Sequence, residues 1–210
     1  MSKYKAIIFD FDNTLFDGTT WFVDFTKEFL KNTPYSSWNY RDFYNELNTQ
    51  TGTSERIDKE ISDAYWSGIK KASPFRPFPE DDDVIKQLHE MGIRIGICSR
   101  SAKTKIDELL KDFHLDEFFE VIIDRAQKPD PKYLLDAIDQ LKLTPKEVLY
   151  VGDEDEDVET GKNAGTDTAY ILRSNEHFQE TYNLQRDKIE QFNPTYKINN
   201  LMELVRIMYS

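Results

Sequence analysis

The stretch "KAIIFDFDNTLF" (residues 5–16) places two aspartates, Asp10 and Asp12, directly after an apolar run. The run is short and rich in isoleucine and phenylalanine, which predicts a buried strand over residues 5–9. In an extended chain, residues i and i+2 point to the same face, so both carboxylates face one site. Two carboxylates about 5 Å apart repel each other by about 3 kcal/mol at an effective dielectric constant of about 20. The pair therefore indicates a cation, or a shared proton, at this end of the strand.

Further short apolar runs follow along the chain, and amphipathic helical patterns separate them. We expect strands at residues 93–98, 120–123, 148–151, 168–172 and 196–198. We expect helices within residues 83–92, 101–113, 130–141 and 199–208. Short buried strands that alternate with helices predict an α/β fold with a doubly wound parallel sheet.

Residues 17–79 interrupt this alternation and contain no strand pattern. Instead, aromatic and aliphatic residues recur at helical spacing in three segments, residues 19–30, 40–47 and 54–71. We expect a small all-helical domain at residues 17–79, inserted after the first strand, whose aromatics mostly form its own core. The main domain then consists of residues 1–16 and 80–210. The polar stretch 173–192 is interpreted as a surface excursion.

The composition excludes several classes of function. The net charge of −12 argues against a nucleic-acid partner and against binding to an anionic membrane surface. The sequence has neither a signal-peptide pattern nor an apolar run of the roughly 20 residues that span a bilayer. We therefore expect a cytoplasmic protein. The single cysteine, Cys98, lies in an apolar run and is expected to be buried.

Polar residues follow each predicted strand at the edge of the sheet where ligands bind in such folds. Beyond Asp10 and Asp12, they are Ser99 and Arg100, then Lys128, then Asp153 and Asp157 in "GDEDED". Each has an ordinary alternative, such as a helix cap, a solvated lysine or a solvated acidic face. Together they predict one site where several carboxylates need a hard divalent cation, for which Mg²⁺ is the usual choice. The sequence contains no phosphate-binding P-loop, no dinucleotide fingerprint and no nucleophile elbow.

Four segments in this order resemble the four motifs of the haloacid dehalogenase-like hydrolase superfamily, phosphatase branch. They are "DFDNTL", the serine of "ICSRS", the lysine of "KPDP" and "GDEDEDVETGKNAG", within roughly residues 4–172. The helical insert resembles the type called a C1 cap. The resemblance implies a Rossmann-like core and a phosphatase that acts on a small phosphorylated metabolite.

The resemblance also assigns roles to residues. It implies that Asp10 is the nucleophile, which forms an aspartyl-phosphate, and that Asp12 is the general acid and then the general base. Ser99 and Lys128 would bind the transferring phosphoryl group. Mg²⁺ would be held by Asp10, the backbone carbonyl of Asp12 and Asp153, with Asp157 supporting the metal site or orienting Lys128. An acid at position 12 points to phosphate esters within the family.

The substrate is left open by the sequence. Arg100, where the family often has asparagine, is either an extra cation near the phosphate or an outward salt-bridge partner. Trp21 and Arg76 are candidates for contact with the leaving group. One alternative function is a phosphomutase of the same fold that acts on a sugar phosphate. A more distant one is a receiver-like signalling domain with a stable phosphoaspartate. The oligomeric state is not indicated.

Overall fold

The structure is a computed structural model. It describes residues 3–38, 43, 46, 57–71, 75–79, 81–173 and 191–209. The chain forms two compact units, one of Met1–Asp17 with Arg76–Ser210 and the other of Gly18–Phe75. The first unit holds the α/β core and the second is the helical insert. Most of the helix predicted at residues 40–47 and most of the polar stretch 173–192 lie outside the described residues.

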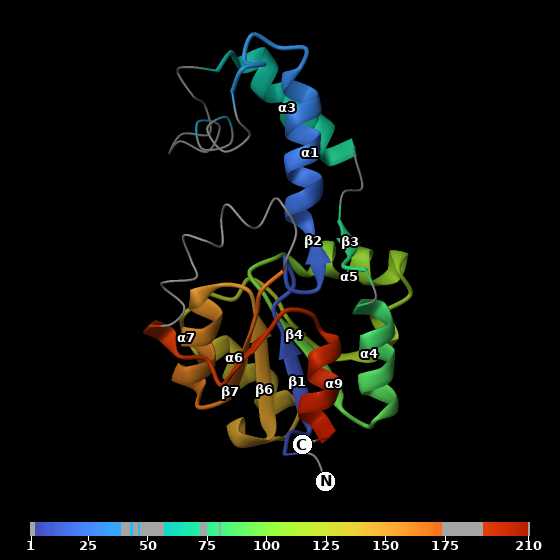
Figure 1. Ribbon diagram of the computed structural model, residues 1–210, viewed down its shortest axis with the longest axis vertical. Helices are drawn as coiled ribbons and strands as arrows, with labels where there is room; N and C mark the ends of the chain where they lie inside the picture. Colours follow the sequence, from blue (N-terminus) through green and yellow to red (C-terminus); the bar gives the residue numbers. More distant parts are fainter. Residues whose placement is uncertain are drawn as a thin grey trace. The chain divides into compact units, whose positions relative to one another are not determined.

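A six-stranded sheet forms the centre of the core unit (Figure 1). Its strands are β1 (Ala6–Phe9), β4 (Arg94–Cys98), β5 (Phe119–Ile123), β6 (Val148–Gly152), β7 (Asp167–Ile171) and β8 (Tyr196–Ile198). Their order in the sheet is β5-β4-β1-β6-β7-β8, and every neighbouring pair is parallel. The predicted α/β fold with a doubly wound parallel sheet is thereby confirmed, and β1 and β6 are the central pair.

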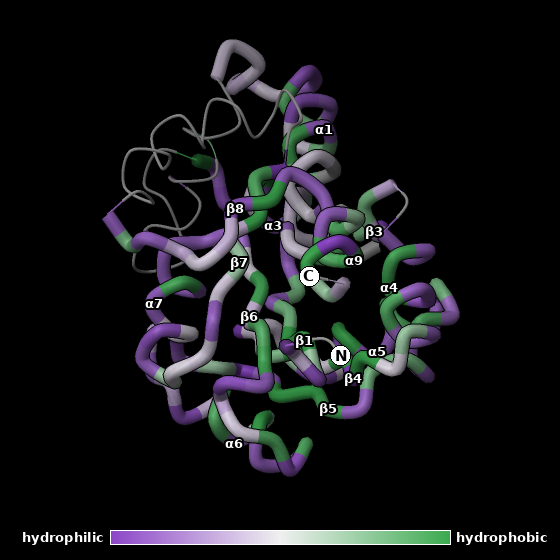
Figure 2. The backbone as a smooth tube through the Cα atoms, turned by 60° about the horizontal axis from the view of Figure 1, so that its bottom comes forward, coloured by the Kyte–Doolittle hydropathy of each residue, from purple (hydrophilic) through white to green (hydrophobic). Residues whose placement is uncertain are grey.

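Helices cover both faces of this sheet (Figure 2). On one side lie α4 (Asp81–Glu90), α5 (Lys103–Asp112) and α9 (Met202–Tyr209), and on the other lie α6 (Lys132–Gln140) and α7 (Asp155–Ala164). Two short 3₁₀ turns, Asp116–Phe118 and Pro145–Glu147, precede β5 and β6. Helix α4 begins two residues before the predicted Asp83, because three acidic residues in its first turn suit the positive end of the helix dipole.

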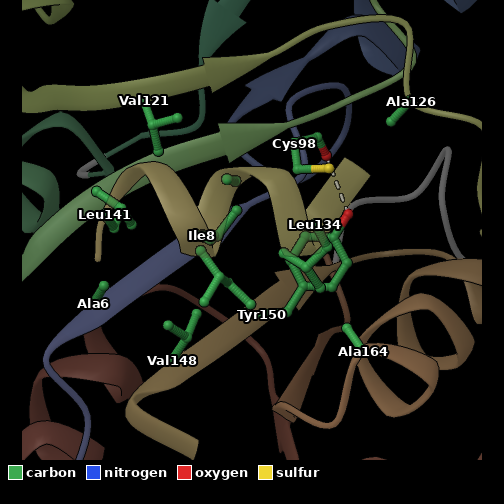
Figure 3. Packing of buried hydrophobic residues seen from close by; sticks show 12 residues of the cluster. Ala6, Ile8, Cys98, Val121, Ala126, Leu134, Leu141, Val148, Tyr150 and Ala164 are labelled. Carbon is green, nitrogen blue, oxygen red and sulfur yellow. Dashed lines mark hydrogen bonds between the residues drawn. The ribbon is translucent and has the colours of Figure 1, made fainter. Parts of the chain in front are cut away.

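The core between the sheet and helices α6 and α7 is a continuous apolar cluster (Figure 3). Alternate residues of β1 supply it, since Ala6 and Ile8 belong to this cluster while Ile7 and Phe9 point to the opposite face. All four β1 side chains are fully buried, as expected for a parallel strand covered on both faces. Cys98 lies in the same cluster as a free buried thiol, which confirms the prediction for this residue.

A second, two-stranded sheet lies where the chain leaves the core and returns to it. Strand β2 (Phe16–Asp17) pairs antiparallel with β3 (Arg76–Pro77), with Phe16 opposite Pro77 and Asp17 opposite Arg76. The prediction that residues 17–79 contain no strand was therefore wrong at this point. Two residues are too few to show an alternating pattern, and a proline is tolerated in a strand edge of this length. The two compact units divide between Asp17 and Gly18 and between Phe75 and Arg76.

The helical unit contains α1 (Gly18–Leu30) and α3 (Lys59–Lys71). Tyr65 of α3 is fully buried at its centre, and its hydroxyl lies 2.8 Å from the hydroxyl of Thr26 on α1. The ring of Phe29 lies 5.2 Å from that of Tyr65 in an edge-to-face arrangement. The described aromatics at helical spacing thus form this unit's own core. Among the described residues, no helix has the length and apolar character needed to cross a membrane.

Candidate active site

The loop after β1 begins as a continuation of the central strand pair. The backbone N–H of Asp10 donates to the carbonyl of Val151 at 2.8 Å, which extends the ladder between β1 and β6 by one residue. Asp10 is consequently buried, with 6% of its surface exposed. Beyond it the chain turns at Asn13, whose φ of 60° lies in the left-handed region that asparagine tolerates. This geometry fixes Asp10 against the sheet and leaves Asp12 in the turn.

Three carboxylates meet at the carboxyl ends of β1 and β6. Asp10, Asp153 and Asp157 each offer one oxygen, these oxygens lie within 4.8 Å of one another, and all three residues are buried. The hydroxyl of Thr14 donates to Asp153 at 2.8 Å. A Cβ added to Gly152 would lie 2.2 Å from the carboxyl carbon of Asp157, so only glycine lets this acid approach β6. Three of the acids predicted from sequence are therefore brought together.

Lys128 supplies the positive charge in this cluster. Its side chain is 2% exposed, and its ammonium group forms ion pairs with Asp10 and, at 2.5 Å, with Asp157. The hydroxyl of Tyr150 lies 3.1 Å from an Asp157 oxygen and 3.1 Å from the carbonyl of Cys98, the second contact being drawn in Figure 3. Asp157 therefore holds the lysine and is itself held by Tyr150, which the sequence interpretation did not single out.

The electrostatics of the cluster are unbalanced. Burial raises the pKa of Asp10 to about 7, although the Lys128 ammonium opposes this rise. Burial and the neighbouring Asp10 and Asp157 charges raise the pKa of Asp153 well above its usual range. Burial lowers the pKa of Lys128, but the two carboxylates outweigh it and keep the lysine protonated. Three carboxylates against one ammonium group leave a need for positive charge, and an all-oxygen donor set fits a hard divalent cation.

The carboxylate of Asp12 is not one of the three that cluster, and it has partners of its own. The hydroxyl of Ser101 donates to one of its oxygens, and the ammonium group of Lys105 lies 2.6 Å from the other. Both partners belong to the start of α5 and its preceding turn. The sequence analysis did not single them out as partners of Asp12. The two aspartates therefore have different surroundings, one among carboxylates and the other between a hydroxyl and an ammonium group.

The residues after β4 divide between the site and the surface. Ser99 is 1% exposed, its backbone N–H donates to Ile123 at 3.0 Å, and its hydroxyl accepts the N–H of Ser101 at 3.3 Å. Arg100 turns to the acidic run, where it forms ion pairs with Glu154 at 2.8 Å and with Glu156. This is the salt-bridge alternative of the sequence interpretation.

The structure describes the side chain of only one of the two candidate substrate contacts. Arg76 lies in β3 with an exposed side chain. The side chain of Trp21 lies outside the described part of the structure. Neither residue belongs to the acidic cluster, so both stay predictions.

The fold and this cluster agree with the comparison to known proteins. A sequence profile of the haloacid dehalogenase-like hydrolases matches residues 7–171, which is more than half of the chain. The chain belongs to the haloacid dehalogenase-like hydrolase family. All the carboxylates and the lysine described above lie within the matched region.

Individual relatives cover the chain to different extents. Pyrophosphatase PpaX of Halalkalibacterium halodurans is 32% identical over 139 residues, which cover 63% of this chain and 60% of that protein. The chain therefore spans less than two thirds of this curated relative. The solved structure of a haloacid dehalogenase-like hydrolase from Bacteroides fragilis has a TM-score of 0.69 and 26% identity, covering 96% of this chain and 100% of the other.

A further structural neighbour also matches nearly the whole chain. A HAD family hydrolase from Deinococcus radiodurans R1, solved with bound phosphate and sodium, has a TM-score of 0.74 at 15% identity. It covers 97% of this chain and 94% of that chain. At this identity the likeness shows that the fold of the family is shared.

Proposed function

We propose that this family member is a Mg²⁺-dependent phosphatase that hydrolyses a small phosphorylated metabolite through an aspartyl-phosphate on Asp10. The observation that carries the proposal is the buried cluster of Asp10, Asp153 and Asp157 around Lys128 at the carboxyl ends of β1 and β6. A structural role alone does not explain three buried acids with one lysine, because buried charge without compensation is costly. A dianionic phosphate ester brings more negative charge, so such a site needs both a metal ion and a lysine.

Asp10 and Asp153 are the side chains proposed to hold Mg²⁺, with the backbone carbonyl of Asp12. When bound, the ion offsets the negative charge of the phosphoryl oxygens and of the carboxylates. Lys128 contributes a second positive charge and orients the Asp10 carboxylate by its ion pair. Asp157 and Tyr150 keep that lysine in place.

The proposed reaction has two steps. In the first, an Asp10 oxygen attacks phosphorus, the bond between phosphorus and the leaving oxygen breaks, and Asp12 gives its proton to that oxygen. In the second, a water attacks the phosphorus of the aspartyl-phosphate, and Asp12 takes the water's proton. Asp10 is regenerated and inorganic phosphate leaves. Ser99, whose hydroxyl is buried beside the loop that follows β4, is proposed to donate to the transferring phosphoryl group.

The separate position of Asp12 supports this division of roles. A general acid that then acts as a general base must reach the proton it transfers, and the Asp12 carboxylate is not one of the three clustered carboxylates. In this structure, Ser101 and Lys105 contact its carboxylate. The helical unit is proposed as the cap that supplies substrate specificity, which is supported by its insertion directly after the catalytic loop.

The Asp10→Asn variant tests the proposal, because an amide cannot attack phosphorus. We expect phosphate release from p-nitrophenyl phosphate and from inorganic pyrophosphate, assayed with Mg²⁺, to fall by at least about 10³-fold. Pyrophosphate is included because the curated relative is named a pyrophosphatase. Asp136→Asn is the matched control, since Asp136 forms an exposed ion pair with Lys132 on α6.

Near-wild-type turnover by Asp10→Asn, with the fold intact by circular dichroism, would contradict the assignment of the nucleophile. Product analysis with sugar phosphates separates hydrolysis from the mutase alternative, because a mutase returns an isomer and a phosphatase releases free phosphate. A stable phosphoprotein without turnover would instead support the receiver-like alternative.

A further inference from the structure

The guanidinium group of Arg173 is buried beside the catalytic loop, and the proposed chemistry does not use it. Arg173 follows β7 by two residues and is 7% exposed. It forms an ion pair with Asp81, the first residue of α4, which is 4% exposed. Its guanidinium carbon lies 3.8 Å from the centre of the Phe78 ring. Arg173 therefore joins the end of β7 to the segment in which the chain re-enters the core.

The third partner of Arg173 is part of the catalytic loop. One Nη2 hydrogen of Arg173 is donated to the backbone carbonyl of Thr14, while the same nitrogen also contacts Asp81. Thr14 is fully buried, and its hydroxyl donates to Asp153 at 2.8 Å. A single residue thus separates Arg173 from a carboxylate of the acidic cluster.

We infer that Arg173 is a positioning residue for metal binding. By holding the carbonyl of Thr14, it fixes the hydroxyl that orients the Asp153 carboxylate toward Asp10 and Asp157. The inference rests on the proposed function, in which Asp153 holds Mg²⁺. Groups that orient metal ligands through hydrogen bonds typically change metal affinity or activity by about 10- to 100-fold when they are removed.

The pairing with Asp81 alone does not account for this arrangement. A buried ion pair is a weak source of stability, because removing two charges from water offsets much of their attraction. An apolar pair could fill the same space between β7 and α4. The contact that such a pair could not replace is the charged hydrogen bond to Thr14, which directs the positive group at the loop carrying Asp10 and Asp12.

The test measures Mg²⁺ affinity by isothermal titration calorimetry on metal-stripped protein, so that it does not depend on turnover. The double variant Arg173→Met/Asp81→Asn removes both charges and leaves no unpaired buried carboxylate behind. We expect its dissociation constant for Mg²⁺ to rise by about 10- to 100-fold. Arg173→Lys keeps the charge but not the bidentate geometry of the guanidinium group, and we expect an intermediate rise in the dissociation constant. If the double variant does not fold, Arg173→Lys carries the test.

Arg94→Met is a control for the loss of an arginine that pairs with an acid and a backbone carbonyl, at a more exposed position than Arg173. Arg94 pairs with Glu120 and donates to the backbone carbonyl of Leu141, so it has the same kinds of partner at the other edge of the sheet. We expect its Mg²⁺ dissociation constant to stay within about twofold of wild type, because it contacts no residue of the loop.

A double-mutant cycle with Thr14→Val tests whether Arg173 affects Mg²⁺ binding through Thr14. Valine keeps the shape of threonine but cannot donate to Asp153. If Arg173 acts through Thr14, adding Arg173→Met/Asp81→Asn to Thr14→Val weakens Mg²⁺ binding by less than about twofold further. If the Arg173 and Thr14 substitutions instead multiply their effects on the Mg²⁺ dissociation constant, the inference is wrong and the proposed function stands. The same holds if the Arg173 variants bind Mg²⁺ with the wild-type dissociation constant. Absence of Mg²⁺ binding by the wild-type protein would overturn the proposed function itself.

Discussion

The two edges of the central sheet carry charged residues in opposite ways. At the edge where the strands begin, each cation pairs with one acid and each pair is at least partly exposed: Lys3 pairs with Asp167 at 2.5 Å, Lys5 with Glu147 at 2.5 Å and Arg94 with Glu120 at 2.6 Å. At the edge where the strands end, three buried carboxylates lie together, and one buried lysine pairs with two of them. The first arrangement is balanced and solvated, and the second is neither.

The pKa values follow the same division. Hydrogen bonds from Lys5 and from Thr144 lower the pKa of Glu147 to about 2, so that acid is more easily ionised in the folded protein. Burial raises the pKa of Asp10 to about 7, so that acid resists ionisation. At the edge where the strands begin, the fold therefore stabilises the ionised form of Glu147. At the edge where the strands end, the ionised form of Asp10 lowers the stability of the fold. We attribute the difference to function, because a site that binds a cation must hold uncompensated negative charge beforehand.

The largest expected effect follows from removing the lysine of the unbalanced edge. Lys128→Met leaves Asp10 and Asp157 buried without their cation, and we expect the free energy of unfolding of the metal-free protein to fall by about 3–5 kcal/mol. Urea denaturation measures this change. Lys3→Met, which breaks an exposed pair at the other edge, should change the same quantity by about 0–1 kcal/mol. Equal losses in the two variants would remove the contrast between the edges.

The next effect is the dependence of stability on pH without metal. The pKa of Asp10 rises from 3.8 to about 7 on folding, so the folded state binds this proton more tightly than the unfolded chain. Its contribution to stability is therefore fully present below about pH 4 and is lost as the pH rises through about 7. We expect the unfolding free energy of metal-free protein to decline across this range, and Asp10→Asn to flatten the decline. A rise in stability over the same range would contradict the assignment.

A smaller change is expected when one acid of the cluster becomes neutral. Asp153→Asn keeps an acceptor for the Thr14 hydroxyl but removes a charge that burial disfavours. We expect the melting temperature of the metal-free protein to rise by about 2–4 °C, which corresponds to about 1 kcal/mol. We expect Mg²⁺ to raise the melting temperature of the wild-type protein but not that of the variant, because ligand binding stabilises only a protein that retains the site. An undiminished response to Mg²⁺ would exclude Asp153 as a ligand.

The smallest effect is expected at the balanced edge. Glu147→Gln removes an exposed charge whose pKa is lowered from 4.5 to about 2, so its contribution to stability is present above pH 4.5 and is lost as the pH falls through about 2. Unfolding in urea at pH 7 should change little, and phosphate release should be unaffected. Acid unfolding followed by circular dichroism should begin at a different pH. A loss of activity would show that the edges are not independent.

Much of the architecture could be predicted from the sequence, for physical reasons that particular residues illustrate. The strand at Ala6–Phe9 was predictable because a parallel strand buried on both faces is a short continuous apolar run. The meeting of Asp10, Lys128, Asp153 and Asp157 was expected because each follows a strand, and parallel strands end at one edge. Topology alone brings such residues together, without knowledge of side-chain conformations.

Contacts that depend on a particular side-chain conformation could not be predicted. The pairing of Asp12 with Ser101 and Lys105 depends on the direction of the turn at Asn13, which the sequence pattern does not specify. Likewise, Arg173 lies in a polar stretch that is typical of a surface segment, yet it is buried against Asp81 and Thr14.

The β2–β3 pair could not be predicted for a different reason. It is held by backbone hydrogen bonds over two residues, which is too short a length for any periodicity.

That small pair of strands has a consequence for how such proteins can be rebuilt. Because Phe16 lies opposite Pro77, the chain leaves the core and returns to it at adjacent positions. For the core, the whole of Gly18–Phe75 is then equivalent to one long hairpin loop. The entropy of closing a loop grows only with the logarithm of its length, so exchanging this insert for a shorter or longer one costs the core little. The β2–β3 pair is thus a natural splice point, at which inserted domains of different size can be transplanted onto one unchanged α/β core.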